Sequence, residues 1–218
     1  MQNTRKRGLE KNLWNWPDSH HKLSFNPCEI AFLYSEIERL LSMGVIVKSE
    51  PEQGQFLSNV FLRPKKNGSF RLILNLRELN KNVTYRHFKM DTLDNCINLM
   101  SPNCFMASLD LRDAYYSVPI APSRQKYLKF RLGDNLYNFT CLPNGLASAP
   151  RTFTKLLKPV FAKLRQSNHA SSGYLDDSFL VGADELTTLK RLQNYWEGLV
   201  SLLTSTSPSY SYPPQSNI

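Results

Sequence analysis

Two aspartates, Asp176 and Asp177, stand side by side in the sequence GYLDDSFLVG, residues 173–182. The residues on both sides form two short apolar runs, which predicts a hairpin with the aspartates at its tip. Asp110 lies near the end of another predicted strand, in ASLDLRDAYYSVPI. Because strands far apart in the chain can be neighbours in one sheet, these three carboxylates could converge. Each feature alone is weak, since aspartates are common in turns and at strand ends.

Three converging carboxylates suit two-metal phosphoryl transfer. In this chemistry two divalent ions, about 3.5–4 Å apart, clamp the attacking and leaving oxygens. Mg²⁺ prefers a few carboxylates together with phosphate oxygens and water. Such cations would offset the repulsion between Asp176 and Asp177, which explains two negative charges at a hairpin tip. The pattern therefore predicts two Mg²⁺ ions as cofactors, with Mn²⁺ able to substitute.

The composition favours a folded chain with a polyanionic partner. Hydrophobic residues make up 41% of the 218 residues, enough for a core, and the formal net charge is +9. A basic balance favours nucleic acid or, less specifically, an anionic membrane surface. The sequence has no run of eighteen apolar residues and no signal-peptide pattern at its start. We therefore expect no membrane span and an intracellular location, in cytoplasm or nucleus.

Helices and hairpins are predicted around these residues. Residues 26–44 form a helix capped by Asn26 and ended by Gly44. Hairpins are predicted over 59–76, turning at KKNGS, and over 126–142, turning at 133–135. A short helix in 90–100 precedes a strand in 104–111. The apolar stripe of the first helix comprises Ile30, Leu33, Tyr34, Ile37, Leu40 and Leu41.

Two further helices are predicted near the Asp-Asp hairpin, one on each side of it in the chain. Ser148 is expected to cap the first, and the second spans residues 184–203. The first has an apolar face of Phe153, Leu156, Leu157, Val160, Phe161 and Leu164, and the second one of Leu189, Leu192, Trp196, Leu199 and Leu203. Residues 1–24 are expected to be a loose basic segment, and residues 205–218 a disordered or non-native tail.

The ordered motifs resemble those of a reverse transcriptase, an RNA-directed DNA polymerase. YLDD follows LDLRDAYYSVPI, PKKNGSFRLILNLRELN resembles the fingers hairpin, and FTCLPNGLASAPRTFTKLL resembles the loop and helix beneath the incoming nucleotide. The resemblance runs from about residue 25 to residue 203 and implies an α+β fold without a thumb. Fingers would occupy about 45–90 and palm about 91–204. DIRS-type retroelements are the most similar subfamily, with Gypsy-like retrotransposons as the runner-up.

The resemblance also implies roles for individual residues. The metal-binding and catalytic carboxylates would be Asp110, Asp176 and Asp177, with the backbone carbonyl of Leu111 as a further metal ligand. The ring of Tyr115 would exclude a ribose 2′-OH. Further nucleotide-binding residues would be Lys65, Lys66, Arg71, Asp113, Ala114, Asn144 and Gly145, and the primer–template contacts would be Tyr174 and Arg151.

The implied reaction joins a deoxynucleotide to a primer 3′-OH. Its partners would be an RNA or DNA template-primer and deoxynucleoside triphosphates. Two alternatives stay open at this point. One is a catalytically inactive nucleic-acid-binding remnant of a retrotransposon. The other is an RNA-dependent RNA polymerase, although such enzymes usually carry Gly-Asp-Asp at the hairpin and lack an aromatic residue like Tyr115.

The sequence departs from the family pattern in three places. Asn75 stands where many relatives have aspartate, and Asn144 where many have Gln or Phe. After the last predicted helix the family continues with a strand and a lysine, whereas no lysine follows Lys190 here. A frame change, splice alteration or degraded copy near Ser205 would explain this. The thumb, ribonuclease H and recombinase domains are also expected to be absent from this chain.

Overall fold

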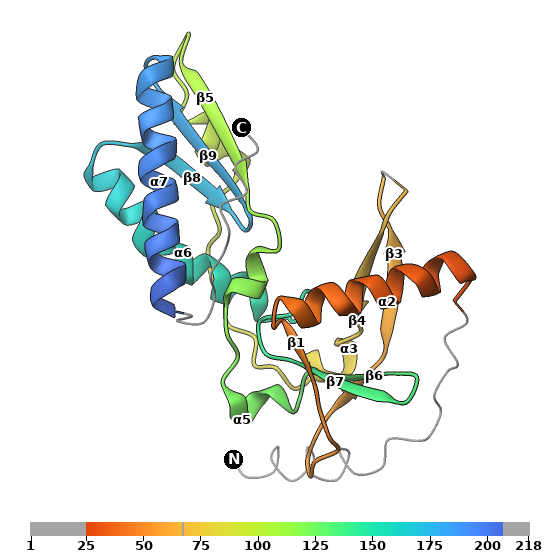
Figure 1. Ribbon diagram of the computed structural model, residues 1–218. Helices are drawn as coiled ribbons and strands as arrows, with labels where there is room; N and C mark the ends of the chain where they lie inside the picture. The colour runs from red at the N-terminus through yellow and green to blue at the C-terminus, as the bar shows by residue number, and fades with distance from the viewer. Residues whose placement is uncertain (1–24, 67, 207–218) are drawn as a thin grey trace, which may run out of the picture. The chain divides into compact units, whose positions relative to one another are not determined.

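The structure, a computed structural model, describes residues 25–66 and 68–206 (Figure 1). The expected loose segment 1–24 and most of the expected tail lie outside this range. The chain divides into two compact units, each built from separate stretches of sequence. Unit 1 comprises residues 1–85 and 120–147, and unit 2 comprises 86–119 and 148–218. No helix in the described part is long and apolar enough to cross a membrane.

The described chain alternates short strands with helices of very different lengths. The elements of unit 1 are α2 (Pro27–Ser42), β1 (Ile46–Lys48), β2 (Leu57–Ser58), β3 (Val60–Pro64), β4 (Phe70–Leu74), α3 (Arg77–Asn80), α5 (Pro122–Gln125), β6 (Lys129–Leu132) and β7 (Asn135–Phe139). Those of unit 2 are α4 (Leu93–Ile97), β5 (Phe105–Asp110), the 3₁₀ helix η1 (Ala114–Ser117), α6 (Ala149–Gln166), β8 (Ala170–Tyr174), β9 (Asp177–Gly182) and α7 (Glu185–Thr206).

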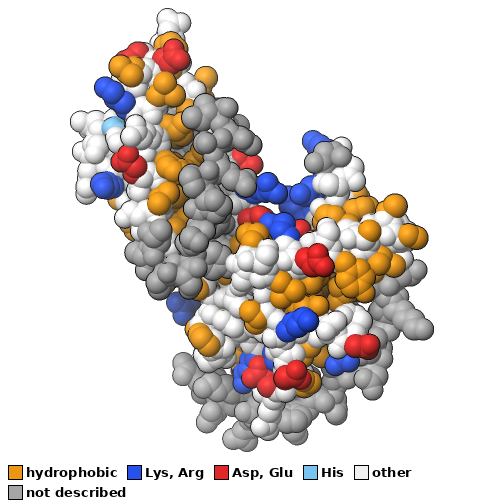
Figure 2. Space-filling view, viewed as in Figure 1, with side chains coloured by type: hydrophobic (Ala, Val, Ile, Leu, Met, Phe, Trp, Pro, Cys, Tyr) orange, Lys and Arg blue, Asp and Glu red, His pale blue; other side chains and the backbone are white. Residues whose placement is uncertain are grey.

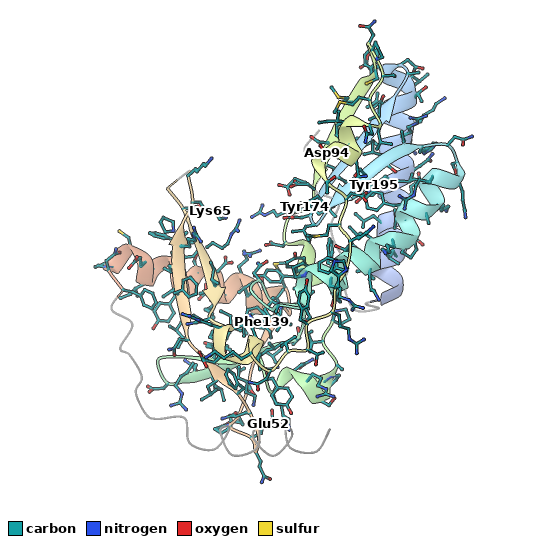
Figure 3. All side chains as sticks on the ribbon, turned by 180° about the vertical axis from the view of Figure 1, so that it is seen from behind. Glu52, Lys65, Asp94, Phe139, Tyr174 and Tyr195 are labelled. Atoms are coloured by element: carbon teal, nitrogen blue, oxygen red, sulfur yellow. The ribbon has the colours of Figure 1, made fainter. Side chains whose placement is uncertain are left out.

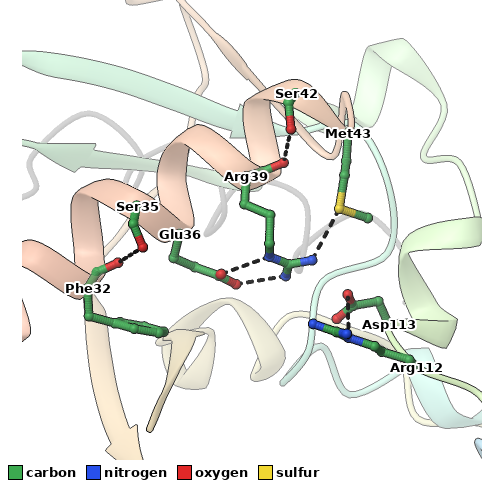
Figure 4. A network of polar contacts seen from close by, with 8 residues as sticks. All are labelled: Phe32, Ser35, Glu36, Arg39, Ser42, Met43, Arg112 and Asp113. Atoms are coloured by element: carbon green, nitrogen blue, oxygen red, sulfur yellow. Dashed lines mark hydrogen bonds and ion pairs between the residues drawn. The ribbon is translucent and has the colours of Figure 1, made fainter.

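The first helix begins as its sequence predicts. The Asn26 side chain accepts a hydrogen bond from the Glu29 backbone N–H, and the Glu29 carboxylate accepts one from the Asn26 backbone. This reciprocal pair satisfies two N–H groups that the helix leaves open. About two turns further on, Arg39 and Glu36 form a two-pronged ion pair, with both nitrogen–oxygen distances 2.8 Å (Figure 4). The predicted stop at Gly44 is confirmed by its φ of 67°.

The apolar stripe of α2 is narrower than predicted. Leu33, Ile37 and Leu40 are buried, whereas Ile30 is 42% and Tyr34 58% exposed. Figure 2 shows hydrophobic side chains lying open over this helix. Ile30 and Tyr34 therefore lie outside the surface that α2 packs against β1 and β4.

Unit 1 contains a four-stranded sheet in the order β1-β7-β6-β2 and a separate β3–β4 hairpin. The two predicted hairpins are confirmed, with Asn135 in β7 rather than in the turn. Lys129 on β6 is only 2% exposed, and its Nζ lies 2.9 Å from Glu52 Oε1 and 2.7 Å from the Glu50 carbonyl oxygen. A buried ammonium needs such partners, so Lys129 fixes the loop before β2 to the sheet.

Unit 2 contains a three-stranded antiparallel sheet in the order β5-β9-β8, with α6 packed on β8 and α7 on β9 and β5 (Figure 1). Ser178 and Leu180 of β9 are buried toward these helices. Because side chains alternate along a strand, Asp177 and Phe179 point to the opposite face. The predicted face of α6 is confirmed, since its six residues all belong to the core of unit 2.

Two predictions about the helices of unit 2 were wrong. Ser148 stands at the start of α6, but its side chain caps nothing, and its carbonyl instead accepts a hydrogen bond from Thr152 Oγ1 at 2.8 Å. On α7, Tyr195 is fully buried, while Leu189 is 51% and Trp196 39% exposed. Leu199 of the predicted face is buried and Leu192 and Leu203 pack against the core, where the Tyr195 hydroxyl pairs with Ser178 Oγ at 2.6 Å.

That buried pair makes a stability prediction. Replacing Tyr195 with Phe should lower the free energy of unfolding by about 1–3 kcal/mol, because the Ser178 hydroxyl is left buried without a partner. Urea unfolding followed by circular dichroism measures this. The double variant Tyr195→Phe/Ser178→Ala should recover part of the loss, whereas Tyr85→Phe at a 78% exposed site should change little. Equal losses for the single and the double variant would contradict the prediction.

Candidate active site

Two of the three aspartates lie on neighbouring strands of unit 2, and the third, Asp176, lies in the turn before β9. Asp110 ends β5 and lies directly opposite Asp177, the first residue of β9. Side chains directly opposite in an antiparallel pair have Cβ atoms about 4.5–5.5 Å apart. One residue further, the Leu111 backbone N–H donates a 3.0 Å hydrogen bond to the Asp176 carbonyl. The main chain thus brings Asp110 together with Asp176 and Asp177, which lie more than sixty positions further along the chain.

A strained tight turn presents the Asp-Asp pair. β8 ends at Tyr174 and β9 begins at Asp177, so Leu175 and Asp176 form a two-residue turn. Leu175 has a φ of 56°, a conformation that hairpin turns usually give to glycine, asparagine or aspartate. A residue held there costs on the order of 1–3 kcal/mol. The two strands of the sheet must hold this turn in place.

The carboxylates repel one another at the tip. The pKa of Asp177 is raised above its ordinary value, first by desolvation and then by the charges of Asp176 and Asp110. All three aspartates are exposed. Repulsion of this kind favours either a proton or a bound cation at the site.

The donor set fits a hard divalent cation, since Mg²⁺ takes carboxylate and carbonyl oxygens. Asp110, Asp176 and Asp177 supply the carboxylates, and their mutual repulsion is what a cation would relieve. As the side chains stand, no three acidic, histidine or cysteine side chains within residues 25–66 and 68–206 form a coordination group. The strand register therefore brings the backbones of the three aspartates together. Their carboxylates would still have to turn toward a bound ion.

Tyr115 lies beside this tip. It belongs to η1, which follows Asp113 in the left-handed conformation, φ 55°. Its ring meets Phe153 of α6 edge-on, with centroids 5.3 Å apart. Burial, and then the charges of Asp176 and Tyr174, raise the pKa of Tyr115 to about 12. The phenol therefore stays neutral, and its ring packs against Phe153.

The other predicted residues of unit 2 lie on the same elements. Tyr174 is 50% exposed at the end of β8, directly opposite Asp177. Ala114 stands at the start of η1, and Asp113 lies near Arg112, whose Nε is 4.0 Å from Asp113 Oδ2 (Figure 4). Arg151 is in the first turn of α6, and its buried Nε has no hydrogen-bond partner in the described chain.

In unit 1, the LPNG loop is braced by a residue that the sequence did not indicate. Asn80 of α3 donates a hydrogen bond of 2.9 Å to the Gly145 carbonyl and accepts one of 2.8 Å from the Ala147 N–H. Gly145 has a φ of 94°, which requires glycine. Asn80 is therefore a positioning residue. Asn80 stands at the end of the LRELN motif, which the sequence analysis singled out. Its hydrogen-bond partner is 65 residues away, so the spacing of the motif could not predict this contact.

The basic residues of unit 1 lie on the β3–β4 hairpin. Lys65 and Lys66 are exposed at its turn (Figure 3 shows Lys65), where Gly68 has a φ of 80°. Arg71 is exposed on β4, directly opposite Arg63 on β3. Like charges opposite each other destabilise a strand pair. None of these four cations forms an ion pair with an acidic side chain in the described part of the chain.

An antiparallel sheet with one aspartate at a strand end beside an Asp-Asp turn is the arrangement of a polymerase palm. The family model described as "Reverse transcriptase (RNA-dependent DNA polymerase)" matches residues 63–205. The chain belongs to this family.

Similar polyproteins come from flies, yeasts and viruses. The chain is 24% identical over 170 residues to the Pol polyprotein from transposon 412 of Drosophila melanogaster, covering 75% of this chain. It is 29% identical over 153 residues to the Pol polyprotein of equine infectious anemia virus, covering 66% of this chain. In both cases the chain spans 13% of the relative's length.

Solved structures with the same fold include foamy virus protease-reverse transcriptases. The native prototype enzyme has a TM-score of 0.70 at 22% identity, with 82% of this chain and 23% of that chain covered. The enzyme in complex with double-stranded DNA has a TM-score of 0.72 at 22% identity, with 82% and 36% covered. These likenesses confirm the predicted mixed fold of fingers and palm.

The repulsion among the carboxylates predicts that removing one of their charges stabilises the folded protein. Replacing Asp177 with Asn should raise the Tm of the metal-free protein at pH 7 by up to about 2 °C, a small value because the site is exposed. The folded pKa of Asp177 is raised, so its ionisation disfavours the folded state once the pH passes its unfolded value. The gain should therefore vanish below about pH 4. Thermal unfolding of both proteins across pH measures this, and a lower Tm for the variant at pH 7 would contradict it.

Proposed function

We propose that this domain is an RNA-directed DNA polymerase that adds deoxynucleotides to a primer 3′-OH. The observation that carries the proposal is the register of unit 2, which sets Asp110 opposite Asp177 and ties Leu111 to Asp176. An aspartate placed at the end of a strand beside an Asp-Asp turn supplies the carboxylates that two-metal nucleotidyl transfer needs. Membership of the reverse transcriptase family supports the same reaction.

In the proposed reaction the primer 3′-oxygen attacks the α-phosphorus of a nucleotide, its proton is lost, and pyrophosphate leaves. Mg²⁺ ions, or Mn²⁺ in their place, would lower the charge on the attacking and leaving oxygens when bound. The protein's part is to hold the ligands. Asp110 and Asp176 provide most of the carboxylate oxygens, Asp177 supports them, and the Leu111 carbonyl completes the set.

Tyr115 would select deoxyribose over ribose. Its ring packs edge-on against Phe153 and stays neutral, so it presents an uncharged aromatic surface. A 2′-OH meeting that surface would clash. On unit 1, Lys65, Lys66 and Arg71 carry positive charge that no acidic side chain in the described chain offsets, and a triphosphate would supply the missing anion.

The partners follow from the same site. Foamy virus protease-reverse transcriptases have been solved with double-stranded DNA and with an RNA/DNA hybrid. We propose that this chain binds such a template-primer together with deoxynucleoside triphosphates, with Tyr174 and Arg151 among the contacts. The motifs FKMDTL and RQKYLKF support a DIRS-type element as the source.

A primer-extension assay tests the activity. With an RNA template, a DNA primer and Mg²⁺ or Mn²⁺, the wild-type chain should extend the primer, and Asp110→Asn or Asp176→Asn should lower the rate by at least about a hundredfold, because each removes a metal-binding carboxylate. Asp134→Asn, which changes an exposed aspartate in the turn between β6 and β7, is the matched control. Equal extension by wild type and Asp176→Asn would contradict the proposal, and no extension by any protein would support an inactive nucleic-acid binder.

Sugar selection gives a second test. Tyr115→Ala should lower the preference for deoxynucleotides over ribonucleotides by about ten- to a hundredfold, because the space beside the sugar opens. Tyr115→Phe keeps the ring and should keep the preference. The measurement is the ratio of kcat/KM for the two nucleotides in single-nucleotide extension. An unchanged ratio in Tyr115→Ala would show that this ring is not the barrier.

A further inference from the structure

Unit 2 has a shallow pocket that the proposed reaction does not use. One wall is a side of α6 that adjoins its core-facing residues Leu157 and Phe161, and another is the segment before α4, with Lys89 and Asp91. Gly173 of β8 and Leu175 of the turn complete it. Leu175 immediately precedes Asp176, so the pocket begins beside the turn that carries the catalytic carboxylates.

The pocket is rich in unpaired positive charge. Lys89, Lys158 and Arg165 all line it and are exposed, and none forms an ion pair in the described part of the chain. The one acid, Asp91, has its Oδ2 engaged by Ser172 Oγ at 2.9 Å. Three cations around one concave surface repel each other, and an anion bound among them would relieve that repulsion.

A buried hydroxyl also lines the pocket without a partner. Thr154 Oγ1 is inaccessible to solvent and makes no hydrogen bond. Most buried polar groups in proteins are paired, and leaving one unpaired costs about 1–3 kcal/mol. A hydroxyl can donate to an oxygen of a bound anion, and the Thr154 side chain would have to turn toward the pocket to do so, because its Oγ1 is closed off from solvent.

The floor of the pocket is closed by a tight contact. A Cβ on Gly173 would lie 2.3 Å from Phe161 Cζ, so only glycine allows the ring to pack against β8. Residues 154, 158, 161 and 165 recur at intervals of three and four, which places them on one side of α6. The pocket therefore has an aromatic floor, with its polar groups around the rim.

We propose that this pocket binds a backbone phosphate of a nucleic-acid strand that passes the Asp-Asp turn. The inference rests on the proposed function, because it takes the template-primer as the source of the phosphate. A phosphodiester carries one negative charge and free oxygens, which suits lysine and arginine side chains with one hydroxyl donor. The position favours a bound strand over free phosphate, since Leu175 both lines the pocket and belongs to the turn that carries Asp176.

Salt-dependent binding tests this with the full chain. The affinity for a fluorescent RNA–DNA duplex is measured by anisotropy over a range of KCl concentrations, with EDTA and without nucleotide. Lys158→Gln/Arg165→Gln should weaken binding roughly five- to tenfold at low salt and reduce the slope of log K against log[salt] by about 1, because one phosphate contact is lost. Thr154→Val keeps the charge and should weaken binding at every salt concentration without changing the slope.

Lys163→Gln is the matched control. Lys163 is exposed on the same helix, and at about 100° per residue it lies on the side opposite Lys158 and Arg165. It should leave the slope unchanged. A slope for the double variant equal to that of Lys163→Gln, with both proteins folded by circular dichroism, would overturn the inference.

Two further measurements distinguish strand binding from phosphate binding, and this inference from the polymerase proposal. Inorganic phosphate titrated into ¹⁵N-labelled wild-type protein should shift the Thr154 amide only weakly. Strong phosphate binding, together with duplex binding that the double variant leaves unchanged, would assign the pocket to free phosphate and overturn the inference. Primer extension by the wild type is scored separately, so failure of the polymerase proposal is distinguishable from failure of this one.

Discussion

The antiparallel pairing of β5 with β9 is the constraint on which the candidate active site depends. It sets Asp110 opposite Asp177, and its last hydrogen bond, from the Leu111 N–H to the Asp176 carbonyl, continues the strand pairing into the turn. A slip of one residue would send Asp110 to the face covered by α6 and α7. The helices prevent such a slip because Leu180 is buried against them.

The candidate site contains two features that destabilise the folded chain. Three carboxylates repel one another, and Leu175 adopts a conformation that suits glycine better. The stability comes from the opposite face of the same sheet, where the core of α6 and α7 includes the buried pair of Ser178 and Tyr195. One face of the sheet therefore provides the stability that the functional face lacks. This division explains why the aspartates can stay exposed and still be fixed in place.

Much of this fold was predictable from the sequence, because it follows from local patterns. Alternating apolar residues and turn glycines predicted the hairpins, and the capping box of Asn26 and Glu29 predicted the start of α2. The convergence of the aspartates was a hypothesis that the strand register now supports. The features that the sequence did not predict depend on contacts between residues that are far apart in the chain. Asn80 braces the LPNG loop, and the bond to Ser178 turns Tyr195 inward in place of Trp196.

The most direct test of the account is to locate the cations. Crystals of the chain with template-primer, a non-hydrolysable deoxynucleotide and Mn²⁺ would give anomalous scattering from the metal alone. The account predicts two peaks about 3.5–4 Å apart, in contact with Asp110 and Asp176 and with the nucleotide phosphates. Peaks that touch neither aspartate, or none at this turn while the nucleotide is bound, would contradict the central claim.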